Sequence, residues 1–263
     1  MIEPYIRKII FVDDSFLEDL RHRSISAYKQ FEAPDLDTKI ITLPANSSEI
    51  SELVSCMSSS DIRAGEVMVR APYIDQFIPL DAFTEDCAVE KYRLWVQLCL
   101  ALGAKSVSIT NIEEITIESD AKSELSASIS GKAPLIEGEV GFKKSDSEQN
   151  REARQSIMRL NAVAEGSEPN LVEAERILKR HGLQGDNMFR SILDMRSVSS
   201  NRLTKQEFSL DLTSDIKKVM NASLKAKVKV MSELYSGRIE IDSVKKALEK
   251  GSSALKLSVT VEF

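Results

Sequence analysis

The sequence predicts an α+β fold, in which a small N-terminal strand–helix unit of βαβαβ type precedes a mainly antiparallel sheet with inserted helices. Two observations lead to this prediction. Short apolar runs alternate with helical segments over the first 70 residues. Beyond residue 104, apolar and polar residues alternate with period two, which is typical of strands with one buried and one solvated face. We therefore expect a first unit at 1–103 and a second at 104–263 with a helical insertion at 145–200, and the two can share one core.

The N-terminal unit begins with the nearly continuous apolar run YIRKIIFV, which is typical of a strand covered on both faces. The segment SFLE that follows predicts a capping box, because its serine and glutamate can each satisfy a free amide at a helix start. Alternating strands and helices favour a parallel unit with right-handed crossovers. The expected elements are a strand at 5–12, a helix at 15–31, a strand at 38–43, a helix at 47–57 and a strand at 66–70.

A long, deeply buried helix is expected next, beginning at Asp81 or Thr84 and ending at Gly103. Its apolar residues recur at intervals of three and four and form a wide stripe. Gly103 lies where a left-handed C-terminal cap is expected. The stripe consists of Ala88, Val89, Tyr92, Trp95, Val96, Cys99, Leu100 and Leu102.

Alternation with period two is clearest at the end of the chain, where Leu257 and Val259 face one way and Lys256 and Ser258 the other. Helices interrupt this pattern, and Pro169 and the pair His181-Gly182 mark the start and the end of one of them. The expected strands are 105–117 with a bulge at 111–114, a Ser-rich hairpin at 122–143, 207–212, 224–230, 239–241 and 255–263. The expected helices are 152–163, 169–181, 187–195, 215–221 and 243–250.

The charge and the cysteines limit the class of protein. The net charge of −6 argues against a dedicated nucleic-acid binder, which needs a basic surface. Residues 215–250 nevertheless hold nine Lys or Arg against five acids, a balance of +4, so the rest of the chain carries −10. Three scattered cysteines without CxxC spacing favour free thiols, and no signal peptide or long apolar run is visible. We therefore expect a cytoplasmic protein.

Two aspartates form a candidate metal site. Asp13 and Asp14 end the first expected strand, and ligand sites of α/β units lie at the carboxyl ends of strands. Paired carboxylates can hold Mg²⁺ there, as a phosphate-handling enzyme requires. The run IIFVDDS resembles the first strand of receiver-type domains, which carry such an acidic pair, although Arg70-Ala71-Pro72 stands where a receiver has its third-strand aspartate. The alternative is that the two acids only complement a helix start.

A lysine run suggests an interaction surface. Lys225, Lys227 and Lys229 are expected to form a cationic ridge on one face of the 224–230 strand, either protecting a sheet edge or contacting an acidic partner or anionic lipid. Ser126 and Ser128 on the 122–143 hairpin would add a hydroxyl-rich surface.

No nucleotide-binding, hydrolase, metalloprotease or calcium-binding motif occurs, and no cofactor is indicated. We therefore expect a non-enzymatic binding or assembly subunit that acts through a two-faced sheet, with a protein partner that can be a second copy of the chain. A membrane-active, oligomerising effector is an alternative, because the layout of hairpin, helices and strands is similar to that of gasdermin- and perforin-type pore-formers. An Mg²⁺-dependent enzyme that uses Asp13 and Asp14 is another.

Overall fold

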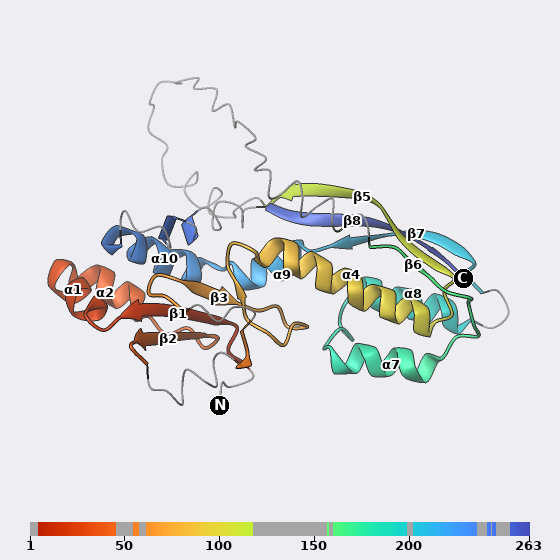
Figure 1. Ribbon diagram of the computed structural model, residues 1–263, viewed down its shortest axis with the longest axis horizontal. Coiled ribbons are helices and arrows are strands. Elements are labelled where there is room, and N and C mark those ends of the chain that lie inside the picture. Colours follow the sequence, from red (N-terminus) through yellow and green to blue (C-terminus); the bar gives the residue numbers. More distant parts are fainter. Residues whose placement is uncertain are drawn as a thin grey trace, which may run out of the picture.

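The computed structural model describes residues 5–45, 55–57, 62–117, 157, 160–198, 202–235, 241–242, 244–245 and 253–263. Over these residues the chain has the predicted α+β class, with seven helices and two four-stranded sheets. The long helix α4 (Phe83–Ala101) runs between the two sheets (Figure 1). No helix in the described part of the chain has the length and apolar character needed to cross a membrane.

The first sheet has the strand order β2-β1-β3-β4. β1 and β2 are parallel, as predicted for a strand–helix–strand crossover, but β3 is antiparallel to β1, so the prediction of an all-parallel unit is wrong. The physical reason is that a strand buried on both faces is apolar throughout in either direction, and its sequence therefore does not encode its orientation. The strands are β1 (Lys8–Asp13), β2 (Thr38–Leu43), β3 (Val67–Val69) and β4 (Ile78–Pro79).

The crossover between β1 and β2 contains two helices where one was expected, α1 (Phe16–Arg23) and α2 (Ile25–Phe31). Ser24 separates them in an extended conformation, and its hydroxyl accepts a hydrogen bond from the amide of Ala27 at 3.2 Å. The predicted capping box is wrong, because Ser15 makes no side-chain cap. The predicted 47–57 helix lies outside the described residues except at 55–57.

The second sheet is antiparallel throughout, with the order β6-β5-β8-β7. Its alternating pattern is confirmed, because Val107, Leu210, Leu257 and Val259 are buried on one face. A register shift between Ile109 and Asn111 places a bulge close to the predicted one. The strands are β5 (Ser106–Thr116), β6 (Ala162–Val163), β7 (Lys205–Asp211) and β8 (Ser253–Glu262).

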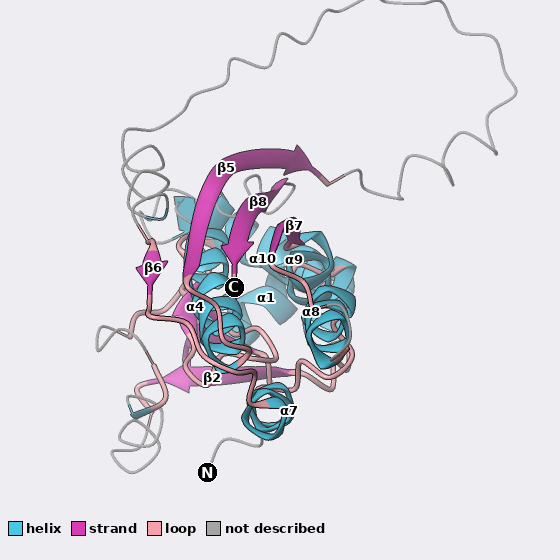
Figure 2. Ribbon diagram, turned by 90° about the vertical axis from the view of Figure 1, so that its right-hand side faces the viewer, coloured by secondary structure: helices cyan, strands magenta, loops and turns pink. Residues whose placement is uncertain are grey.

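Helices cover the inner face of this sheet, and Figure 2 shows α4, α8 and α9 on one side of β5, β8 and β7. One hydrophobic cluster contains Ile10 of β1, Trp95 of α4 and Val259 of β8, so residues of both predicted units share one core. The covering helices α7 (Leu171–Arg180), α8 (Asn187–Ser197) and α9 (Thr213–Val219) lie close to their predicted positions.

Two glycines end helices in the left-handed conformation, as predicted. Gly103 has φ +88° after α4, and Gly182 has φ +65° after α7. A Cβ atom at Gly103 would lie 2.0 Å from the backbone oxygen of Ser167, so no larger residue fits there.

The largest error concerns 224–230, which belongs to helix α10 (Ala222–Leu234) and not to a strand. Leu224, Lys227, Val228 and Met231 are buried at spacings of three and four, and the side chain of Asn221 caps the helix at the amide of Leu224. Seven alternating residues satisfy a helical stripe as well as a strand, and the lysines, alanine and leucine of LKAKVKV are good helix formers.

Two further predictions are wrong in part. Ala162 and Val163 form the short strand β6 against Ser106 and Val107, although a helix was expected to include them. Ile241 is buried in a helical conformation and not in a strand. In both cases tertiary packing outweighs a weak local preference. The predicted 122–143 hairpin, and the predicted 243–250 helix except for 244–245, lie outside the described residues.

Candidate functional site

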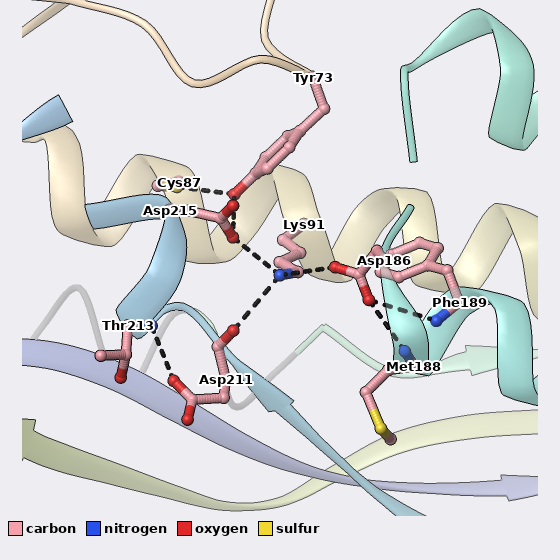
Figure 3. A network of polar contacts seen from close by, with 9 residues as sticks. All are labelled: Tyr73, Cys87, Lys91, Asp186, Met188, Phe189, Asp211, Thr213 and Asp215. Atoms are coloured by element: carbon pink, nitrogen blue, oxygen red, sulfur yellow. Dashed lines mark hydrogen bonds and ion pairs between the residues drawn. The ribbon is translucent and has the colours of Figure 1, made fainter. Parts of the chain in front are cut away.

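A polar cavity of about 370 Å³ lies where α4, the start of α8 and the β7–α9 junction meet. The side chain of Lys91 projects from α4 into this junction and is 4% exposed (Figure 3). Its Nζ lies 2.8 Å from Oδ2 of Asp215 and 3.0 Å from Oδ2 of Asp186. It also donates a hydrogen bond of 3.3 Å to the backbone oxygen of Asp211. One buried ammonium group on α4 thus contacts the start of α8, the first turn of α9 and the end of β7.

The acids around Lys91 are positioned by helix starts. Asp186 is the N-cap of α8, and its Oδ1 accepts hydrogen bonds from the amides of Met188 and Phe189 at 3.0 and 3.4 Å. Asp215 lies in the first turn of α9, where a carboxylate complements the helix dipole. Both acids therefore stabilise helix ends in addition to pairing with the lysine.

Two further polar side chains extend this network (Figure 3). The Tyr73 hydroxyl donates to Oδ2 of Asp215 at 3.4 Å and lies 2.8 Å from Sγ of Cys87. Burial raises the pKa of Cys87 to about 12 and raises the pKa of Tyr73 well above its ordinary value. Burial alone would lower the pKa of Lys91, but the carboxylates of Asp215 and Asp186 outweigh it and raise that pKa.

At neutral pH the thiol, the phenol and the amine are consequently all protonated. A nucleophile or general base needs the opposite shift, a lowered pKa for a thiol or an amine. The protonation states of the Lys91 network therefore suit a role in stabilising the fold, by holding the helices together. Removing one partner of such a buried pair is strongly destabilising, because the other charge remains uncompensated.

A second candidate site is the outer face of the second sheet, opposite the helices. The strand register places polar residues in rows across β5, β8 and β7. The first row is Ser106, Glu262 and Lys205, the second is Ser108, Thr260 and Glu207, the third is Asn111, Ser258 and Ser209, and the fourth is Glu113, Lys256 and Asp211. We call these twelve residues the outer polar face.

Hydrogen bonds organise part of the outer polar face. Lys205 and Ser106 both donate to the carboxylate of Glu262, and the hydrogen bond from Lys205 lowers the pKa of that carboxyl group. The hydroxyl of Thr110 at the bulge donates to Glu207 across the central strand at 3.3 Å. The central hydroxyls are half-buried between longer charged side chains, so the face is polar and shallow.

The predicted metal site is present only as two neighbouring acids. Asp13 is half-buried and Asp14 is exposed. The Asp13 amide donates to the Tyr235 hydroxyl at 2.8 Å, and Oδ1 of Asp14 accepts from the amide of Ser15. No group of three potential ligands from His, Cys, Asp or Glu occurs within the described ranges. Metal binding by Asp13 and Asp14 stays a prediction.

The predicted lysine ridge does not exist as one face. On helix α10, Lys225 is half-buried, Lys227 is 2% exposed and Lys229 is exposed. Nζ of Lys227 donates to the backbone oxygens of Phe31 and Ala33, so this lysine caps the end of α2. Ser126 and Ser128 lie outside the described residues.

Sequence reasoning missed the Lys91 network. A signal was available, because Lys91 lies between Cys87 and Trp95 on the buried stripe of α4, where a charged residue needs a partner. The identity of that partner was not readable, since Asp186 and Asp215 are far away in the chain. No family model, no curated protein and no solved structure matches this chain.

Proposed function

We propose that the protein is a non-enzymatic binding or assembly subunit whose contact surface is the outer polar face. The observation that carries the proposal is the register of β5, β8 and β7, which gathers the hydroxyls of Ser106, Ser108, Ser258 and Thr260 on the side away from the helices, where Thr110 at the bulge adds a fifth. The residues of the outer polar face do not belong to the hydrophobic core, because the side chains that these strands contribute to the core lie on the opposite face.

The chemistry of the outer polar face suits a protein partner. Hydroxyl groups both donate and accept hydrogen bonds, and non-obligate interfaces are about as polar as the rest of a protein surface. The face has four carboxylates, on Glu113, Glu207, Asp211 and Glu262, against the two ammonium groups of Lys205 and Lys256. This excess of negative charge disfavours a nucleic acid, which would need a basic surface.

The Lys91 cavity supports the non-enzymatic part of the proposal. Its buried lysine pairs with Asp186 and Asp215, and the pKa shifts of Lys91, Cys87 and Tyr73 keep all three protonated. The two alternative functions, a pore-forming effector and an Mg²⁺-dependent enzyme, have no comparable support. Helix α10 removes one strand from the pore-former layout, and Asp13 and Asp14 lack a third ligand among the described residues.

The outer polar face can be tested with the double variant Ser108→Arg, Ser258→Arg, which places two large cations on neighbouring central strands. The matched control is Ser26→Arg, Gln30→Arg, which adds the same charge to the exposed face of α2. Proteins that co-purify with each form are quantified by mass spectrometry, and binding of a recovered partner is then measured with purified components. Sedimentation velocity tests whether the partner is a second copy.

We expect a partner that binds the wild type and the α2 variant and binds the outer-face variant at least about tenfold more weakly. Circular dichroism and thermal melting establish that both variants are folded. Equal binding by the outer-face variant would refute the proposal.

A further inference from the structure

A groove of about 480 Å³ lies next to the Lys91 cavity, with which it shares Tyr73, between the 73–78 segment, the N-terminal half of α4 and His181 after α7. Part of its lining is apolar, from Ile74, Ile78 and Leu94, which are 7%, 4% and 3% exposed. Asp75, which is exposed, and Asp86 and Glu90, which are half-buried, add carboxylates to the same groove. An apolar lining with acidic groups beside it resembles the two parts of a peptide-binding groove.

The acidic groups of the groove are only partly neutralised. Arg93 pairs with Glu90 at 2.7 Å, whereas Asp86 has no ion-pair partner in the described part of the chain. Burial raises the pKa of Asp86, and the neighbouring carboxylates of Glu90 and Asp81 raise it further. These carboxylates therefore repel one another in the free protein, and a cation bound between them would relieve that repulsion.

Helix stability explains only part of this arrangement of acids. Asp86 lies in the first turn of α4, where an acid is favoured by the helix dipole. Glu90 lies one turn further on, beyond the reach of that effect, and like charges four residues apart destabilise a helix. Arg93 offsets this repulsion at Glu90, whereas Asp86 has no ion pair within the described residues, so a basic ligand would supply the counter-charge that Asp86 lacks.

We propose that this groove docks a basic segment of a partner protein, with one aliphatic side chain against Ile74, Ile78 and Leu94 and with lysine or arginine side chains against Asp86 and Glu90. The occupant is basic because of charge complementarity, and aliphatic at its centre because of the apolar lining. The groove is separate from the outer polar face, so this inference does not depend on the function proposed above.

The test uses a fluorescein-labelled peptide in which a central leucine is flanked on both sides by lysine and arginine, with binding followed by fluorescence anisotropy. The groove variant is Asp86→Asn, Glu90→Gln, which removes two charges and keeps the side-chain shapes. The matched control is Glu18→Gln, Asp19→Asn on the exposed face of α1, which changes the net charge equally. A second peptide carries serine in place of leucine.

We expect the groove variant to bind the leucine peptide at least about fivefold more weakly than the wild type, and the α1 variant to bind it within about twofold. The serine peptide should bind more weakly than the leucine peptide to the wild type. Hydrogen exchange should slow in 73–78 when the leucine peptide is added. Equal binding to the wild type and the groove variant, equal binding of both peptides, or no binding at all would overturn the proposal.

Discussion

Strand β8 and helix α10 have similar sequence patterns and different structures. In β8, Leu255, Leu257, Val259 and Val261 alternate with polar residues over the whole strand, and the strand lies in the middle of a sheet. In α10 the alternation covers only seven residues, and the buried positions recur every three or four. Alternation therefore identifies a strand only when it is too long to match a helical stripe as well.

The lysines of β8 and α10 also lie in different environments. Lys256 of β8 lies on the outer polar face with its neighbours at 258 and 260. In α10, by contrast, Lys227 points into the protein, where its Nζ lies 5.6 Å from the centre of the Phe31 ring and donates to two backbone oxygens. A helix therefore separates residues 227 and 229, which a strand would have placed on one face.

The largest expected effect comes from Lys91, the buried lysine that pairs with carboxylates, and it sharpens the contrast with Lys227. Lys91→Met should lower the free energy of unfolding by about 4 kcal/mol at neutral pH, because the buried carboxylate of Asp215 and the half-buried carboxylate of Asp186 would both lose their counter-charge. Urea denaturation followed by circular dichroism measures the difference. A loss below about 1 kcal/mol would show that the Lys91 network does not lock the helices.

The stabilisation by Lys91 and that by Lys227 should depend on pH with opposite signs. The folded state raises the pKa of Lys91 above 10.5, so its stabilisation is present below pH 10.5 and is lost as the pH rises through the raised value. Burial lowers the pKa of Lys227 below 10.5, so the wild type should gain stability relative to Lys227→Met as the pH rises through that lowered value toward 10.5. Denaturation of both variants at several pH values distinguishes the two cases.

In β8, the inner and outer faces should respond very differently. Leu257→Ala should cost about 3 kcal/mol, because it removes a fully buried side chain from the core. Ser258→Ala, one residue further on and on the outer face, should change stability by no more than about 0.5 kcal/mol. Similar losses for both variants, measured by urea denaturation, would contradict the two-faced strand.

Proline distinguishes a helix from a strand in α10. Lys229→Pro should cost about 3 kcal/mol, because proline in a helix interior removes a backbone hydrogen bond and clashes with the preceding turn. Ala222→Pro lies at the first helical position after the Asn221 cap and should cost less than about 1 kcal/mol. Thermal melting of both variants measures this. The same two substitutions would not show this order if 222–234 were an edge strand.

Lys227 and Lys229 provide a finer test of the same helix. Lys227→Met should cost about 1 kcal/mol, because the backbone oxygens of Phe31 and Ala33 would lose their donor. Lys229→Met should be neutral within about 0.5 kcal/mol, because that side chain is exposed. Equal effects in urea denaturation would mean that both lysines share an environment, as the strand prediction required.

The fold was readable from the sequence where a pattern was long and had one interpretation. Strand β8 and helix α4 with its Gly103 cap are the clearest examples. The prediction was wrong where short runs satisfied two periods, as in 224–230, and where burial on both faces hid strand direction, as in β3. Of the candidate sites, the two-faced strands were predicted but the contact residues were not, because the expected lysines at 225–229 lie on α10. The Lys91 network depends on contacts across more than 90 residues of chain.

The smallest expected effect tests the outer polar face itself. Oγ of Ser209 is covered by neighbouring atoms and has no hydrogen-bond partner within the described ranges. Ser209→Ala should therefore leave stability unchanged or raise it by up to about 1 kcal/mol, because it removes an unsatisfied hydroxyl. Ser106→Ala is the matched variant, since that half-buried hydroxyl donates to Glu262 at 3.4 Å, and it should lose about 0.5 kcal/mol, the lower end of the net value of a hydrogen bond. If Ser209→Ala were the more damaging change in urea denaturation, the Ser209 hydroxyl would have a partner in solution, and the centre of the outer polar face would be occupied by the protein's own groups and not open to another protein.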